Sequence, residues 1–184
     1  MKLLKNTLIS LKTVVTLSMA NKAVFFDRDG TLNVDVHYLH RPEDFIWIDG
    51  AKEAIKHVKD QGYLAILVTN QSGVARGFYP ESDVVAVYNW MNQELAKIGT
   101  ELDALYYCPH HPDGKIAVYR KVCDCRKPGP LLINKACQKY DIDKKQSYFV
   151  GDTATDMQCA KNAGIIGIKY ENGSLYDLVK SSIK

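Results

Sequence analysis

Residues 22–33 read Lys22-Ala-Val-Phe-Phe-Asp27-Arg-Asp29-Gly-Thr-Leu-Asn33, an apolar run that ends in two aspartates and a glycine. Val24, Phe25 and Phe26 favour a β-strand and do not alternate with polar residues, which is typical of a strand buried on both faces of a parallel sheet. In open α/β sheets, ligands bind outside the carboxyl ends of the strands. The stretch therefore predicts that Asp27 and Asp29 lie at a functional edge of the sheet, although an Asp-x-Asp-Gly turn without a function has the same pattern.

The composition is that of one soluble globular domain. The chain has 184 residues, of which 46% are apolar and 24% are charged, which is ordinary for this class. Its first eighteen residues hold three lysines and no acid, and the remaining 21 basic and 21 acidic residues cancel. We see no basic stripe and no apolar segment near the roughly 20 residues that a membrane helix needs. We therefore expect no nucleic acid and no membrane as partners.

Residues 1–18 form an N-terminal extension in this interpretation. Lysines precede a short apolar run, and the small residues Ser18 and Ala20 resemble those at a signal-peptidase site. Threonines interrupt the run, and the extension could equally lie upstream of a true start at Met19. We expect one domain over residues 19–184.

Apolar strands and amphipathic helices alternate along the rest of the chain. We predict strands at 24–26, 63–68, 102–107, 147–150 and 165–169, and helices at 51–62, 81–98, through 132–140, and at 156–163, with loops at 33–50 and 69–77. This alternation favours an α/β fold in which a doubly wound parallel sheet forms the middle of three layers.

Polar side chains gather at the predicted sheet edge. They form four groups, which are Asp27 with Asp29, Thr69 with Asn70, Arg126 with Lys127, and Asp152 with Asp156. Converging carboxylates suit Mg²⁺, which prefers oxygen ligands. Cations beside such a metal site would neutralise the charge of a phosphoryl group during its transfer. The four groups therefore predict a magnesium-dependent phosphoryl-transfer site.

A second cluster combines cysteine and histidine. Cys108 and His110 are followed, after twelve residues, by Cys123 and Cys125. Three thiolates and one imidazole are the ligand set of a closed tetrahedral zinc site, which has no position for a substrate. We therefore expect a structural Zn²⁺ that holds the loop before Arg126, with His111 as an alternative ligand. An odd number of cysteines with this spacing also favours a reducing compartment over a disulfide framework.

The four polar groups resemble the signature motifs of the haloacid dehalogenase (HAD) superfamily. The matching stretches are Asp27-Arg-Asp29-Gly-Thr-Leu, Thr69-Asn, Lys127-Pro and Gly151-Asp152-x-x-x-Asp156. The resemblance implies a HAD-like Rossmannoid fold with a zinc-binding loop and no large cap domain. It also implies that Asp27 is the nucleophile, that Asp29 is the general acid and base, and that Thr69 and Lys127 hold the phosphoryl group.

The same resemblance implies the magnesium ligands. They are the Asp27 carboxylate, the Asp29 carbonyl and Asp152. Asp156 either orients the neighbouring groups or only caps the following helix.

Longer stretches are similar to the histidinol-phosphatase and heptose-bisphosphatase subfamily, and most similar to its heptose branch. They include Arg41-Pro-Glu-Asp-Phe45, residues 69–77, Tyr106-Tyr-Cys-Pro-His-His-Pro112 and residues 123–130. The similarity implies a cytoplasmic phosphatase that removes the 7-phosphate of D-glycero-D-manno-heptose 1,7-bisphosphate, on the route to nucleotide-activated heptose for lipopolysaccharide or other surface glycans. We expect it to act as a monomer.

The similarity also implies the substrate contacts, with Arg126 recognising the second phosphate. The implied residues are Asp35, Val36, His37, Tyr38, Thr69, Asn70, Gln71, Ser72, Arg126 and Lys127. This chain has His37 where the subfamily usually has glycine, and Thr153 where a lysine commonly stands. These departures bear on substrate preference and not on the predicted chemistry.

Two other functions compete with this one. A histidinol-phosphate phosphatase would share the zinc loop and the mechanism. A non-catalytic, zinc-stabilised phosphosugar-binding module would lack a nucleophile or an acid, whereas Asp27 and Asp29 are both present.

Overall fold

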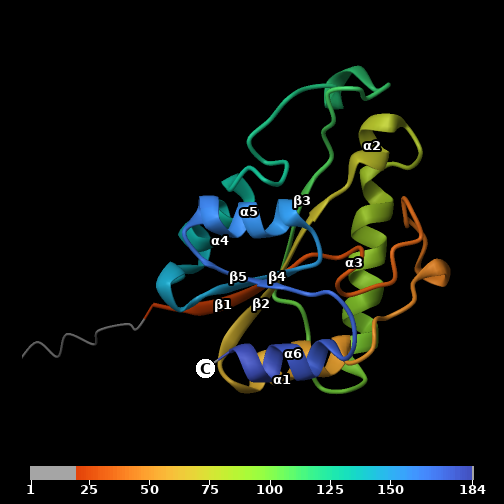
Figure 1. Cartoon of the computed structure of the whole chain (residues 1–184). Coiled ribbons are helices and arrows are strands. Elements are labelled where there is room, and N and C mark those ends of the chain that lie inside the picture. Colours follow the sequence, from red (N-terminus) through yellow and green to blue (C-terminus); the bar gives the residue numbers. More distant parts are fainter. Residues whose placement is uncertain (1–19, 184) are drawn as a thin grey trace, which may run out of the picture.

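The computed structural model describes residues 20–183, in which five parallel strands form one sheet in the order β3-β2-β1-β4-β5 (Figure 1). The predicted extension at residues 1–18 lies outside the described residues. The strands are β1 Lys22–Phe26, β2 Tyr63–Asn70, β3 Ala104–Cys108, β4 Tyr148–Gly151 and β5 Ile166–Lys169. The predicted parallel α/β architecture is confirmed.

Helices cover both faces of the sheet and make three layers (Figure 1). On one face lie α1 Ala51–Asp60, α3 Glu81–Ala96 and α6 Leu175–Ser182, and on the other lie α4 Leu131–Tyr140 and α5 Ala154–Ala163. In β1, Val24 and Phe26 pack on the first face while Ala23 and Phe25 pack on the second, and all four are fully buried. Helices cover both faces of the strand, so the residues on both faces are apolar. Each fully buried phenylalanine stabilises the fold by about 1.5–3 kcal/mol.

Two helices were not predicted. The short helix α2, Ser72–Arg76, lies inside the predicted loop 69–77. Gly73 occurs in this helix because a Cβ atom there would lie 2.2 Å from the ring of Tyr79. The C-terminal helix α6 does carry a sequence signal, since its buried Leu175 and Val179 are four residues apart, but the segment is short.

Three 3₁₀ turns complete the described elements. They are η1 Pro42–Asp44, η2 Ala117–Tyr119 and η3 Lys144–Gln146. Within residues 20–183, the two long connections between a strand and the next α-helix run from β1 to α1 and from β3 to α4, and the second of them is the predicted zinc loop rather than a cap domain. None of the helices in this part of the chain is long and apolar enough to cross a membrane.

The strand register brings the polar groups to one edge. Phe26 pairs with Leu67 of β2 and with Val150 of β4, and the Asp27 amide donates to the Val150 carbonyl at 3.0 Å. Strand β2 is two residues longer than predicted and contains Thr69 and Asn70. Predicted residues 102–107 shift to Ala104–Cys108, so β3 ends on the first predicted zinc ligand.

Candidate active site

Asp27 and Lys127 form a buried ion pair at the carboxyl end of β1. The Lys127 ammonium lies 2.7 Å from Asp27 Oδ1, and the Asp27 backbone immediately follows the central strand. Burial raises the pKa of Asp27 to about 7, although the Lys127 cation opposes the shift. A divalent cation bound to the same carboxylate would favour its charged form, which is the nucleophilic one.

Lys127 was predicted beside a strand end but lies in the long connection between β3 and α4. Asn70 holds it there, because its side-chain amide donates to the Lys127 carbonyl at 3.2 Å and accepts from the Lys127 amide at 3.0 Å. Burial alone would lower the pKa of Lys127, but Asp27 and Asp156 raise it, so the group stays cationic. The structure therefore places Lys127 at the predicted sheet edge, but the loop after β3, and not a strand, brings it there.

Of the two roles that the sequence left open for Asp156, the structure favours the orienting one, although Asp156 also takes part in the capping of α5. Its Oδ1 atom lies 2.7 Å from the Lys127 ammonium, while Oδ2 accepts from the backbone amide and the hydroxyl of Thr153 at 3.0 and 2.6 Å. Thr153 is the N-cap of α5, and Asp156 is the third helical residue of a capping box. Asp156 is fully buried and holds Lys127 beside Asp27, while Thr153 and not Asp156 is the first capping residue of the helix.

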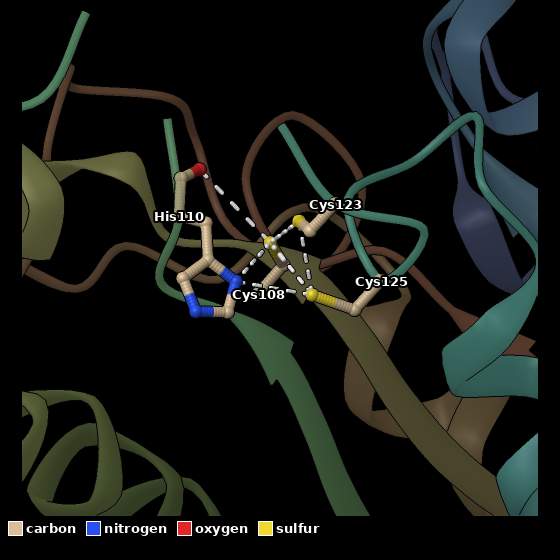
Figure 2. A group of neighbouring side chains, drawn as sticks. All are labelled: Cys108, His110, Cys123 and Cys125. Carbon is tan, nitrogen blue, oxygen red and sulfur yellow. Dashed lines mark hydrogen bonds between the residues drawn. The ribbon is translucent and has the colours of Figure 1, made fainter. Parts of the chain in front are cut away.

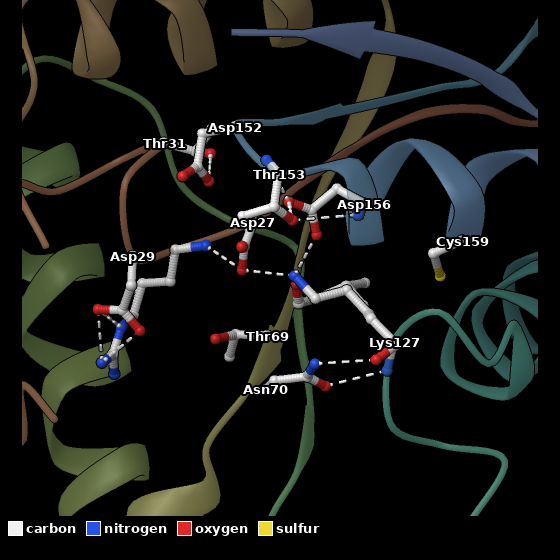
Figure 3. Close-up of polar contacts among 12 residues, drawn as sticks. Asp27, Asp29, Thr31, Thr69, Asn70, Lys127, Asp152, Thr153, Asp156 and Cys159 are labelled. Carbon is white, nitrogen blue, oxygen red and sulfur yellow. Dashed lines mark hydrogen bonds and ion pairs between the residues drawn. The ribbon is translucent and has the colours of Figure 1, made fainter. Parts of the chain in front are cut away.

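Three carboxylates at this edge lie close enough to share a cation. Oxygen atoms of Asp27, Asp152 and Asp156 all lie within 4.8 Å of one another. Because Lys127 and Thr153 already occupy both oxygens of Asp156, Asp27 and Asp152 are the pair that would hold a metal (Figure 3). Two carboxylates with room for water fit Mg²⁺, which keeps several water ligands. The Asp29 carbonyl stays a predicted third ligand.

Gly30 is required at this site for two reasons. Its φ angle is +82°, which side chains disfavour, and a Cβ atom would lie 2.4 Å from Oδ2 of Asp152. The turn after β1 can therefore press against the Asp152 carboxylate, which the Thr31 hydroxyl also contacts at 3.1 Å. Asp152 is thereby placed beside Asp27.

The Asp29 carboxylate is held by donors on several sides. Arg28 approaches it with Nε at 3.1 Å and Nη2 at 2.9 Å, and Asn33 approaches Oδ1 at 3.2 Å. Arg28 is 1% exposed and donates further to the Leu39 carbonyl at 2.8 Å. Figure 3 shows Asp29 and Lys127 on either side of Asp27. The predicted acid, Asp29, therefore lies apart from Lys127, which pairs with the predicted nucleophile Asp27.

Thr69 lies at the end of β2 and is 1% exposed. Its hydroxyl oxygen accepts from the Gln71 amide at 2.9 Å. An accepting hydroxyl turns its own proton away from the donor, so the Thr69 proton can serve a phosphoryl oxygen.

A cavity of about 490 Å³ joins these groups. Its wall includes Asp27, Asp29, Thr69, Asn70, Arg126, Lys127 and Thr153. Arg126 is half-buried, and its guanidinium reaches the carbonyl of His110 at 3.5 Å. A cation therefore lies at the same cavity as the nucleophile but belongs to the zinc loop.

The predicted substrate loop divides between cavities. Asp35 lines the 490 Å³ cavity, while His37, Tyr38, Gln71 and Ser72 line a neighbouring cavity of about 220 Å³ together with Asp29 and Asp35. His37 and Tyr38 both have φ angles of +56°, which explains a preference for glycine at position 37. Val36 lines neither of these cavities, but it lies with His37 and Tyr38 at a third cavity, which does not include Asp27 or Asp29.

The four predicted zinc residues converge (Figure 2). The Cys125 sulfur lies 3.2 Å from His110 Nδ1, 3.2 Å from the Cys123 sulfur and 3.3 Å from the Cys108 sulfur. Burial lowers the pKa of His110 and so favours the neutral imidazole, which is the form that binds metals. Three thiols and one imidazole around one point fit a tetrahedral Zn²⁺.

His111 is outside this cluster. Its Nδ1 atom accepts from the Asp113 amide at 3.1 Å, and its Nε2 atom lies 3.3 Å from Arg76. The geometry therefore selects His110 over His111 as the candidate ligand.

Sequence reasoning missed Arg28, Asn33 and Tyr79 as members of the site. Arg28 lies inside the Asp-x-Asp turn, where an arginine would be expected to be solvated, and only the folded loop at Leu39 buries it. Tyr79 follows α2 and donates to Gln71 at 2.8 Å. The sequence carries no local signal for either contact, because each one joins segments that different elements position.

Comparisons with known proteins agree with this site. A family profile described as HAD-hydrolase-like matches residues 124–177. The chain is 46% identical, over 78% of its length and 76% of the relative, to the D-glycero-β-D-manno-heptose-1,7-bisphosphate 7-phosphatase of Yersinia pestis. It is 48% identical to the protein of the same name from Pasteurella multocida, over 78% of each chain.

A solved structure is also similar. The D,D-heptose 1,7-bisphosphate phosphatase of B. bronchiseptica, complexed with magnesium and phosphate, aligns with a TM-score of 0.76 at 28% identity. The alignment covers 87% of this chain and 97% of that one.

Proposed function

Because this chain belongs to the D-glycero-β-D-manno-heptose-1,7-bisphosphate 7-phosphatase family of HAD-like hydrolases, we propose that it removes the 7-phosphate of D-glycero-D-manno-heptose 1,7-bisphosphate. One observation carries the proposal: Asp27, Asp29, Thr69, Lys127 and a second cation, Arg126, line the same cavity. A nucleophile, an acid and two cations suit a substrate with one phosphate to be cleaved and another to be recognised.

The reaction proceeds in two steps on the residues of this chain. An Asp27 oxygen attacks the phosphorus of the 7-phosphate, an O–P bond forms, and the bond from phosphorus to the sugar oxygen breaks. Asp29 gives a proton to the departing sugar oxygen. Asp29 then takes a proton from a water molecule, whose oxygen attacks the aspartyl phosphate, so that inorganic phosphate leaves and the Asp27 carboxylate returns.

The supporting groups have separate tasks. Lys127 orients Asp27 and, with the Thr69 hydroxyl, contacts the phosphoryl oxygens. Mg²⁺ held by Asp27, the Asp29 carbonyl and Asp152 would supply positive charge that offsets the charge of the phosphoryl group. Zn²⁺ held by Cys108, His110, Cys123 and Cys125 would be structural.

The cellular setting is part of the proposal. The three thiols of the zinc cluster need a reducing compartment, which supports the cytoplasm. We propose a monomer as the working form. We place the reaction in the synthesis of nucleotide-activated heptose for lipopolysaccharide or other surface glycans.

Substrate and metal are tested together by measuring phosphate release. We expect kcat/KM for the heptose bisphosphate to exceed that for histidinol phosphate by at least about tenfold, because histidinol phosphate has no second phosphate for the pocket to bind. A brief EDTA treatment that leaves the zinc content of the protein unchanged is expected to abolish the activity, and Mg²⁺ added alone is expected to restore it, because the proposed zinc holds the loop and does not take part in the chemical step. A higher kcat/KM for histidinol phosphate would contradict the assigned substrate, and recovery that requires added zinc would contradict the assigned metal roles.

Arg126→Ala tests recognition of the second phosphate. An arginine–phosphate contact contributes about 1.5–3 kcal/mol, so we expect KM for the bisphosphate to rise about 10- to 100-fold. KM for the heptose 7-monophosphate should stay unchanged, because that substrate has no phosphate at its other end. Arg120→Ala is the matched control, since Arg120 is exposed in the same loop and does not line the cavity. If both substrates lost affinity equally, Arg126 would serve the scissile phosphate instead.

A further inference from the structure

Gln71 joins the two strand ends that carry the proposed acid and the phosphoryl-binding hydroxyl. Its Nε2 atom donates to Oδ2 of Asp29 at 3.1 Å and to Oγ1 of Thr69 at 2.9 Å. Both hydrogens of the amide are thereby used within the protein, and the side chain is 2% exposed. Gln71 was predicted to contact the substrate, and it lines the smaller cavity, but these two bonds direct its amide hydrogens to Asp29 and Thr69.

The other donors to Asp29 cannot do what Gln71 does. Arg28 and Asn33 belong to the same turn as Asp29 and therefore move together with it. Gln71 directly follows β2, and its backbone amide donates to the Cys108 carbonyl at the end of β3 at 2.8 Å. It is therefore the contact that fixes Asp29 relative to Thr69, across the place where the phosphoryl group sits.

Tyr79 determines which way the Gln71 amide faces. Its hydroxyl donates to Oε1 of Gln71 at 2.8 Å, so the NH₂ group must face Asp29 and Thr69. The Tyr79 ring is 6% exposed and stacks on His40 with 5.0 Å between ring centroids and 7° between planes. It also fills the space that Gly73 leaves open. The ring cannot turn away without displacing these neighbours.

We propose that Gln71 is a positioning residue, locked by Tyr79, which holds the Asp29 carboxyl group at the leaving oxygen of the substrate. This inference rests on the proposed function. It predicts that loss of Gln71 impairs protonation of the leaving group. The resulting loss of kcat should be largest for a substrate whose leaving group needs a proton to depart. A sugar alkoxide needs one, whereas p-nitrophenolate leaves readily without one.

The test compares two variants on two substrates. Gln71→Leu keeps the volume of the side chain and removes its hydrogen bonds, and Tyr79→Phe removes only the hydroxyl. We expect Gln71→Leu to lower kcat for the heptose bisphosphate about 100-fold, within the range that general acid catalysis contributes. The loss on p-nitrophenyl phosphate should be at least about tenfold smaller, with KM for both substrates nearly unchanged. Tyr79→Phe should show the same pattern at about fivefold, the effect of one ordinary hydrogen bond.

Tyr88→Phe is the matched control. Tyr88 also donates a half-buried hydroxyl, to the Leu102 carbonyl at 2.9 Å, but it lines neither of the two site cavities. Its kcat should equal that of the wild type on both substrates. If Gln71→Leu does not fold, as judged from its melting temperature, Tyr79→Phe carries the comparison.

Three outcomes would overturn the inference. A raised KM with unchanged kcat would make Gln71 a substrate contact, and equal losses on both substrates would mean that it does not act through Asp29. Unchanged kinetics in both variants would show that neither Gln71 nor Tyr79 has a role in turnover. A wild-type enzyme that cleaves p-nitrophenyl phosphate but not the heptose bisphosphate would instead overturn the proposed function, so the two failures are distinguishable.

Discussion

Asp27→Asn is expected to lower kcat by at least about 10⁴-fold, in line with the loss of a covalent nucleophile in other enzymes. An amide has no charged oxygen to attack phosphorus, and it no longer pairs with the ammonium group that lies 2.7 Å from Asp27 in the wild type. Measurement of single-turnover phosphate release, with acid quenching to look for an aspartyl phosphate by mass spectrometry, checks the result. The wild type should form the adduct and the variant should not.

The Asp27→Asn protein should remain folded. Lys127 keeps its second partner, Asp156. A neutral amide also avoids the cost of burying a charged carboxylate, the cost that raises the pKa of Asp27 to about 7 in the wild type. Asp103→Asn is a matched control, because Asp103 pairs with Lys59 in a partly buried ion pair far from the cavity wall, and its turnover should be normal. Full turnover by Asp27→Asn would contradict the covalent mechanism, and a wild type without any turnover would favour the non-catalytic binding module.

Cys125→Ser is expected to remove the bound zinc and to lower both stability and turnover. Structural zinc sites contribute about 10–16 kcal/mol of apparent binding free energy, and a serine hydroxyl is a poor replacement for a thiolate. If only about 3 kcal/mol of that is lost from folding, the melting temperature falls by about 10 °C for a chain of this size. Turnover should fall as well, because Arg126 and Lys127 directly follow Cys125 in the loop that the metal holds.

Zinc content, melting temperature and kcat are measured on the same preparation. Cys137→Ser is the control, because Cys137 is a buried thiol on α4 that belongs to the apolar core and not to the cluster. It should keep a wild-type zinc content. If the Cys125→Ser protein retained zinc at the wild-type level, Cys125 would not be a zinc ligand and the proposed site would be wrong.

The loop after β3 connects the Cys/His cluster with the proposed magnesium site. Cys108 ends β3, its carbonyl accepts from the Gln71 amide, and Cys125 lies two residues before Lys127. Loss of zinc is therefore expected to disturb both the nucleophile's partner and the contact that orients Asp29. This is why we expect kcat to fall in Cys125→Ser although the zinc cluster offers no position for the substrate.

The sequence and the structure agree best where the signal is local. Strand β1 was predicted because three consecutive apolar β-formers admit few other structures, and Asp27 then had to follow its carboxyl end. The cluster of Cys108, His110, Cys123 and Cys125 was predicted because thiol and imidazole spacing is itself the signal. Helix α2 was missed because Gly73 inside it and Gly77 directly after it are typical of loops, and only contact with Tyr79 explains Gly73.

The sequence alone was enough to predict the parallel α/β fold, the reaction type and the residues proposed to perform it, because strand periodicity and motifs that resemble a known family are encoded in short stretches. Only the tertiary structure decided which partner each side chain has. It showed that Asp156 is shared between Lys127 and Thr153, that Asn70 holds the Lys127 backbone, and that Gln71 serves Asp29. These contacts join segments up to 57 residues apart for Asn70 and Lys127, and their geometry depends on sheet register and loop packing, which no short stretch of sequence specifies. The Asp27-Arg28-Asp29 turn therefore identifies the chemistry, while the fold determines how its acid and its nucleophile are held.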